Sequence, residues 1–63
     1  MTRKDYVLIA AALKLARVRG DYAHDTHMLA GVDRAAEKVA DALADDNRAF
    51  DRARFLQACG VAS

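Results

Sequence analysis

The sequence has 63 residues, which suffice for one small domain but leave little chain for the walls of a typical substrate pocket. It contains no proline, three glycines and one cysteine, so it excludes an internal disulfide and favours helices. Its net charge of +1 conceals a strong segregation of charge along the chain. We therefore expect an all-α protein in which residues 1–63 form a single helical domain.

The first helix is expected to run from about Arg3 to Arg19. Thr2 is a good N-cap, and Asp5 at the third helical position favours the helix start. Gly20 follows the expected end, where a left-handed glycine commonly terminates a helix. Apolar side chains recur along one side of this segment and predict its buried face: Tyr6, Ile9, Ala10, Leu13 and Ala16, widened by Val7, Ala12 and Leu15.

The second helix is expected from residue 26 or 27 to residue 44 or 45, with Asp25 or Thr26 as its cap. Gly31 inside it costs about 1 kcal/mol relative to alanine, so it is expected to allow a close backbone approach or to mark a later helix start. Apolar residues repeat at spacings of three and four, as in the seam of a packed helix pair: Leu29, Val32, Ala36, Val39 and Leu43.

The third helix is expected to be short, from about Arg52 to Cys59. Asp51 is a good N-cap, and Phe50 and Phe55 have the spacing of a hydrophobic staple across it. The residues that follow predict a Schellman ending, with Gly60 in the left-handed position and Val61 closing back on Leu56.

These elements predict a small three-helix bundle, with two longer antiparallel helices and a short C-terminal helix whose phenylalanines close one end of the pair. Residues 20–25 are expected to be irregular. A chain of this size buries only about 60% of the surface that its unfolded form exposes. A homodimer that completes the core through the first or the second helix is therefore also expected.

Charge is distributed in blocks, and the acidic block contains a regular pattern. Residues 1–20 carry five basic groups and one acidic group, residues 21–46 carry two and seven, and residues 47–63 carry three and one. Within the second block, four carboxylates recur every four residues and share one ridge of the second helix. We call this set the acidic row: Asp33, Glu37, Asp41 and Asp45.

Like charges at this spacing repel, so the acidic row needs cations nearby. Arg34 and Lys38 flank it, and Arg52 and Arg54 of the third helix are placed to reach it. Two interpretations follow. The row is a solvated face neutralised within the chain, which is the commoner situation, or it is a docking strip for a basic partner surface.

Residues able to support chemistry are few. His24 and His27, with Asp21 and Asp25 beside them, form the one cluster that resembles metal ligands, but two solvated histidines at a helix entry fit this spacing better. Cys59 lies at a helix C-terminus, where the dipole disfavours a thiolate, and is expected to be a small buried hydrophobe. We therefore expect no enzyme activity, no catalytic residues, no metal site and no cofactor.

Basic residues of the first helix fall on different sides of it, so they do not form the continuous face that phosphate binding requires. A small DNA-associated regulatory protein, using Arg48, Arg52 and Arg54, stays open as an alternative function. The apolar run from Tyr6 to Leu13 is too short to span a membrane and has no convincing export signal. Together with the single free thiol, this favours a cytoplasmic protein.

Both ends of the chain resemble a group of short uncharacterised proteins of bacteriophages and prophages. The likeness covers about two-thirds of the sequence and leaves out the segment from about residue 17 to residue 32. Where that group has proline after Asn47, this chain has Arg48. The matching segments are residues 1–6 (MTRKDY), 8–13 (LIAAAL), 39–44 (VADALA), 46–47 (DN), 50–56 (FDRARFL) and 58–60 (ACG).

The resemblance implies a phage or mobile-element origin and no particular mechanism. Small phage proteins are often accessory factors that bind a host protein, including CRISPR effectors of host defence. The predicted function is therefore a phage-type accessory protein that inhibits or modulates a host protein, contacting its basic surface through the acidic row. A structural subunit of a phage assembly, stable through self-association, is the third expectation.

Overall fold

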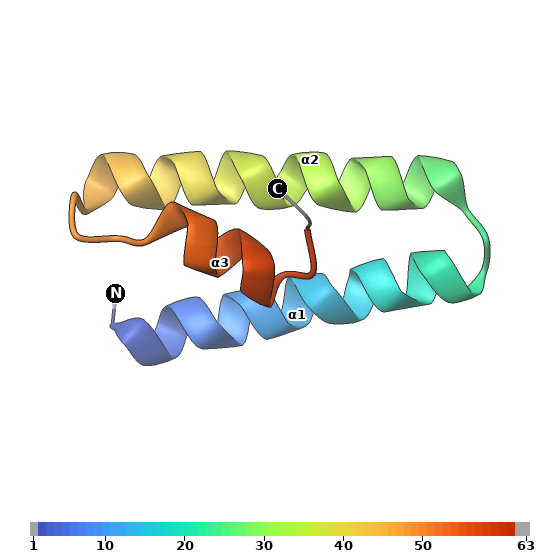
Figure 1. The fold of residues 1–63 in the computed structure, drawn as a ribbon, viewed down its shortest axis with the longest axis horizontal. Helices are drawn as coiled ribbons and strands as arrows, with labels where there is room; N and C mark the ends of the chain where they lie inside the picture. The colour runs from blue at the N-terminus through green and yellow to red at the C-terminus, as the bar shows by residue number, and fades with distance from the viewer. Residues whose placement is uncertain (1, 62–63) are drawn as a thin grey trace.

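A computed structural model describes residues 2–61, which form three helices (Figure 1). Helix α1 spans Arg3–Tyr22, α2 spans Thr26–Asp46 and α3 spans Arg52–Ala58. The two long helices run antiparallel, and α3 folds back between them and packs against both. The predicted all-α three-helix architecture is confirmed.

Helix α1 begins where the sequence predicts and ends three residues later. The Thr2 N–H donates to Asp5 Oδ2 at 2.9 Å, and the Thr2 hydroxyl donates to the same oxygen at 3.2 Å. These bonds to the charged form, led by the backbone bond, hold the pKa of Asp5 below its ordinary value. The predicted N-cap at Thr2 is therefore confirmed.

The end of α1 corrects the prediction for Gly20. Gly20 is buried within the helix, and His24 adopts the left-handed conformation (φ 55°) instead. The His24 N–H bonds to the Asp21 carbonyl and the Asp25 N–H to the Gly20 carbonyl, both at 3.0 Å, which makes a Schellman motif. The irregular segment is thus limited to residues 23–25. Gly20 serves close packing, because a Cβ there would lie 3.3 Å from side-chain atoms of Leu29 and Met28.

Helix α2 is capped by Asp25, whose Oδ1 accepts from the Met28 N–H at 3.0 Å. Its predicted apolar seam is buried or half-buried, with Ala36 fully buried, and Ala40, which the prediction did not include, is fully buried as well. Gly31 matches neither of its predicted roles, since α2 starts at Thr26 and a Cβ at Gly31 would meet nothing within 4 Å.

Gly31→Ala is expected to stabilise the protein by about 1 kcal/mol, because the position is helical, exposed and open to a methyl group. Gly20→Ala is the matched control, since its methyl group would press on Leu29 and Met28 and offset the same gain in helix propensity. Urea unfolding followed by circular dichroism measures both variants. Equal gains would contradict the close packing at Gly20.

Helix α3 has the predicted signals at both ends. The Asp51 carboxylate accepts from the Arg54 N–H at 3.0 Å, and the rings of Phe50 and Phe55 lie 5.4 Å apart across this cap. Gly60 has φ 82°, in the left-handed region that favours glycine. The Gly60 N–H bonds to the Gln57 carbonyl and the Val61 N–H to the Leu56 carbonyl, which confirms the Schellman ending.

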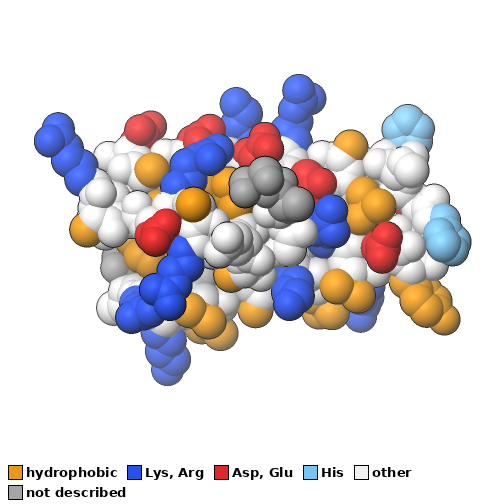
Figure 2. Space-filling model, viewed as in Figure 1, with side chains coloured by type: hydrophobic (Ala, Val, Ile, Leu, Met, Phe, Trp, Pro, Cys, Tyr) orange, Lys and Arg blue, Asp and Glu red, His pale blue; other side chains and the backbone are white. Residues whose placement is uncertain are grey.

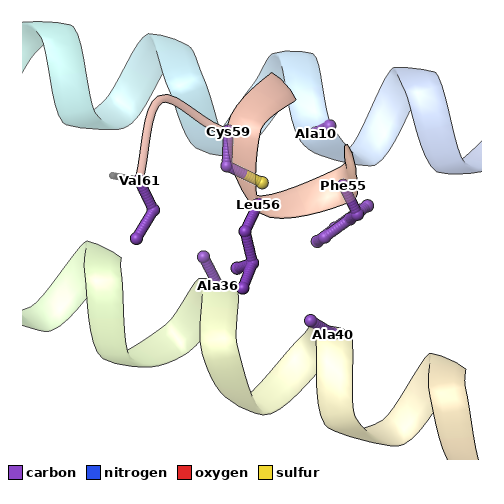
Figure 3. Packing of buried hydrophobic residues seen from close by; sticks show 7 residues of the cluster. All are labelled: Ala10, Ala36, Ala40, Phe55, Leu56, Cys59 and Val61. Carbon is purple, nitrogen blue, oxygen red and sulfur yellow. The ribbon is translucent and has the colours of Figure 1, made fainter. Parts of the chain in front are cut away.

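The buried core joins α3 to small residues of both long helices (Figure 3). Phe55 lies between Ala10 of α1 and Ala40 of α2, and Leu56 points toward Ala36. Alanines at these places let α3 approach both helices closely. The seven most buried hydrophobic residues are Ala10, Ala36, Ala40, Phe55, Leu56, Cys59 and Val61.

On α1 the predicted buried face is confirmed in its centre and wrong at its edges. Tyr6, Ile9 and Leu13 pack against the core. Val7, Ala12 and Leu15, which were expected to widen this face, are exposed. The reason is geometric: α2 and α3 together cover only one side of α1, and these three residues lie outside that side.

Candidate interaction site

The acidic row runs along α2 on successive helical turns, and the structure divides it into two pairs. Asp33 faces α1, where its Oδ1 accepts from Arg17 Nε at 2.8 Å. Asp41 faces the start of α3, where its Oδ1 accepts from Arg52 Nε at 2.8 Å. The side chains of the Arg17–Asp33 pair are about one-third exposed, and those of the Arg52–Asp41 pair are about half exposed. These two carboxylates therefore fasten α2 to different helices.

The alternate members, Glu37 and Asp45, are exposed. Within residues 2–61 the ion pairs are those of Asp33 and Asp41, and neither Glu37 nor Asp45 takes part in one. The prediction that Arg52 reaches the row is confirmed. The interpretation as a face neutralised within the chain fits half of the row, and the other half presents carboxylates to solvent.

Arg17 was not identified from the sequence as a partner of the row. Because α1 continues to Tyr22, Arg17 lies well inside the helix and beside α2. A signal was present, since Arg17 follows Leu13 by four residues and so continues the buried face. A cation on that line is placed to meet a carboxylate of the neighbouring helix.

The end of α2 concentrates negative charge. Asp45 and Asp46 occupy its last turn, which contains no basic residue. The helix dipole is itself negative there, so acidic side chains in this turn are electrostatically unfavourable. Asn47 next to them serves the fold, because its Nδ2 donates to the Tyr6 hydroxyl at 3.3 Å and its Oδ1 accepts from the Ala49 N–H at 3.0 Å. The two carboxylates thus create a strongly negative end of α2.

A groove of about 460 Å³ lies between the first half of α1 and α3. Tyr6, Val7 and Phe55 contribute to its apolar lining, and Arg3 and Arg54 are among its polar lining residues. The Tyr6 and Phe50 rings meet edge to face with centroids 4.9 Å apart. Aromatic packing between Tyr6 of α1 and Phe50, just before α3, therefore forms part of the groove lining.

His24 lies in the turn between the long helices and His27 lies in the first turn of α2, both at one end of the molecule (Figure 2). Asp25 beside them is engaged as the cap of α2. In the part of the chain that the structure describes, no three His, Cys, Asp or Glu side chains lie close enough to hold a metal ion.

Cys59 is fully buried between the three helices, as expected for a small hydrophobe. Burial raises the pKa of its thiol, because the thiolate would be poorly solvated there.

The three arginines that the DNA-binding alternative would use lie in different surroundings and do not form one site. Arg52 is paired with Asp41, Arg54 lines the groove, and Arg48 lies in the turn before α3. Side chains of both signs alternate over the face that Figure 2 shows, rather than forming a basic surface.

None of the helices within residues 2–61 is both long and apolar enough to cross a membrane. Comparison with protein-family models, curated proteins and solved structures finds no match to this chain, so the resemblance of its two ends to phage proteins stays a prediction.

Proposed function

We propose that this chain is a phage-type accessory protein that binds and inhibits or modulates a host protein through the outer side of α2. The observation that supports this proposal is the division of the acidic row. Asp33 and Asp41 are occupied in holding the helices together, whereas Glu37 and Asp45 remain exposed. Asp45 also stands in the last turn of α2, which contains no basic residue and where the helix dipole is negative, so a cation of the partner would stabilise it.

The partner that fits is a host protein with a basic surface, such as the nucleic-acid groove of a defence complex of the CRISPR type. Glu37 and Asp45 are eight residues apart, so they lie about 12 Å apart along the helix axis. Two carboxylates at this spacing can each pair with a different lysine or arginine side chain of such a surface. Such charges steer association and fix the register of the complex. The site of action is then the cytoplasm of the host cell.

The test removes the same number of carboxylates from the two halves of the row. Glu37→Gln with Asp45→Asn is expected to weaken capture of the host protein at least tenfold, and more strongly at low salt, because exposed charges contribute most there. Asp33→Asn with Asp41→Asn is the matched control, expected to lower thermal stability and to keep binding. Quantitative mass spectrometry of proteins captured from host lysate gives the partner, and titration with the purified partner gives the affinity.

Equal binding by the two double variants would contradict the proposal. Salt-dependent binding to duplex DNA, lost on Arg48→Ala with Arg54→Ala, would instead support the DNA-associated alternative. Recovery of the chain only as its own oligomer would support a subunit of a phage assembly.

A further inference from the structure

Helix α1 is apolar on two opposite sides, and only one of them is covered. The covered side packs on α2 and α3 through Ile9 and Leu13. On the other side large apolar residues are exposed: Leu8 by 59%, Leu15 by 57%, Val18 by 53% and Tyr22 by 89%. Hydrophobic side chains, with Lys and Arg side chains between them, lie along the lower edge of the molecule in Figure 2, the edge that α1 occupies in Figure 1. Large exposed apolar residues gathered on one helix face are typical of an interaction site.

The exposed residues follow one strict pattern. Together with Ala11 they recur at alternating spacings of three and four, which is the seam of a coiled coil. We call this set the outer stripe: Leu8, Ala11, Leu15, Val18 and Tyr22. It extends over about 21 Å of helix. The best-fitting occupant is another straight helix whose side chains interlock at the same spacing.

We propose that the occupant is the outer stripe of a second copy of this chain, packed antiparallel about a two-fold axis near residue 13. In this register Leu8 lies against Val18 of the second copy, and Ala11 lies against Leu15 of the second copy. The two central layers then pair alanine with leucine, and the layers beside them pair leucine with valine. Ala12 lies beside Ala12 of the second copy near the axis, where small side chains permit close approach of the helices.

Charges beside the outer stripe select this orientation. The antiparallel register brings Asp5 of each copy beside Arg19 of the other copy. Asp5 can accept a hydrogen bond from that arginine through Oδ1, because both bonds from Thr2 go to Oδ2. Lys4 falls opposite the exposed ring of Tyr22, which suits a cation–π contact. One contact in this register is unfavourable, because Lys14 lies beside Lys14 of the second copy at the axis. The long lysine side chains can extend into water there, which weakens their repulsion. A parallel pair would instead place Lys14 beside Arg19 of the second copy twice, and it would lack the pairing of Asp5 with Arg19 that offsets such repulsion.

The dimer would supply what a 63-residue chain lacks. Both apolar sides of α1 become buried, and the two α1 helices form the centre of the dimer with one α2 on each outer side. Since α2 packs on the side of α1 opposite the outer stripe, the acidic row stays accessible on both copies. This inference does not depend on the proposed function, because it concerns a different face of the molecule.

Sedimentation equilibrium tests the dimer directly. The wild-type chain is expected to have twice its mass of 6.9 kDa, and Leu15→Glu is expected to sediment as a monomer that keeps its helical circular dichroism. Ala35→Glu, at an exposed position of α2, is the matched control and is expected to stay dimeric. A wild type that is monomeric at every concentration, or a dimeric Leu15→Glu variant, would overturn the inference.

Disulfide trapping tests the orientation with near-native variants. An equimolar mixture of Leu8→Cys and Val18→Cys is expected to form the mixed disulfide on mild oxidation, whereas Leu8→Cys alone is expected to stay reduced. Wild type controls for Cys59, which is fully buried. Efficient self-coupling of Leu8→Cys would overturn the proposed register, because an axis near residue 13 keeps the two copies of residue 8 about 15 Å apart along the helices.

Discussion

Phe55→Ala is expected to remove most of the stability of this protein. The ring is almost fully buried between α1 and α2 and also packs against Phe50. Replacing a buried phenylalanine with alanine costs about 3 to 5 kcal/mol. A domain of this length has a total stability of about 3 to 9 kcal/mol, so a loss of this size leaves little or none. Urea unfolding followed by circular dichroism should show a much lower midpoint, or no folded baseline.

Gln57→Ala provides the control on the same helix. Gln57 is exposed, so its truncation is expected to change stability by no more than about 0.5 kcal/mol. A Phe55→Ala variant that unfolds at the wild-type midpoint would mean that α3 contributes little to the core. The packing shown in Figure 3 would then be incorrect.

Ala40→Leu is expected to displace α3 by the opposite mechanism. Ala40 is fully buried where Phe55 meets α2, and no part of its surface faces solvent. Three additional carbon atoms must therefore push the helices apart or force a strained side-chain conformation. Overpacking of this kind costs about 1 to 3 kcal/mol. Thermal unfolding should show the loss, and the near-ultraviolet signals of Tyr6 and Phe55 should weaken as α3 moves away.

Ala42→Leu makes the same chemical change two residues further along α2, at an exposed position. Alanine and leucine have similar helix propensities, so this control is expected to be nearly neutral. Equal destabilisation by the two variants would show that the effect comes from α2 itself and not from its contact with α3.

The sequence predicted the helices well because their ends have local signals. Asp51, Phe50 and Gly60 specify α3 through contacts within a few residues, and no distant part of the chain is needed to recognise them. Helix α1 shows the limit of this approach. The rule that glycine ends a helix pointed to Gly20, but tight packing against Leu29 required a glycine inside the helix. A histidine took the left-handed position instead.

Predictions for the surface were less complete, because they depend on which faces other helices cover. Periodicity identified apolar residues all along α1 but could not say that Leu15 would face away from the core. The acidic row was located correctly on α2, since spacing alone places its residues on one ridge. That Asp33 would meet Arg17, while Glu37 would meet no cation within residues 2–61, depends on the packing of α1 against α2.

The alternation within the acidic row also bears on how this sequence can diverge. A change at Asp33 or Asp41 breaks a bond between helices and needs a compensating change at Arg17 or Arg52. Changes at Glu37 and Asp45 break no ion pair within residues 2–61 and so need no compensating change. Under the proposed function, a lineage can therefore exchange these two side chains as its target changes, while Asp33 and Asp41 change together with their arginine partners.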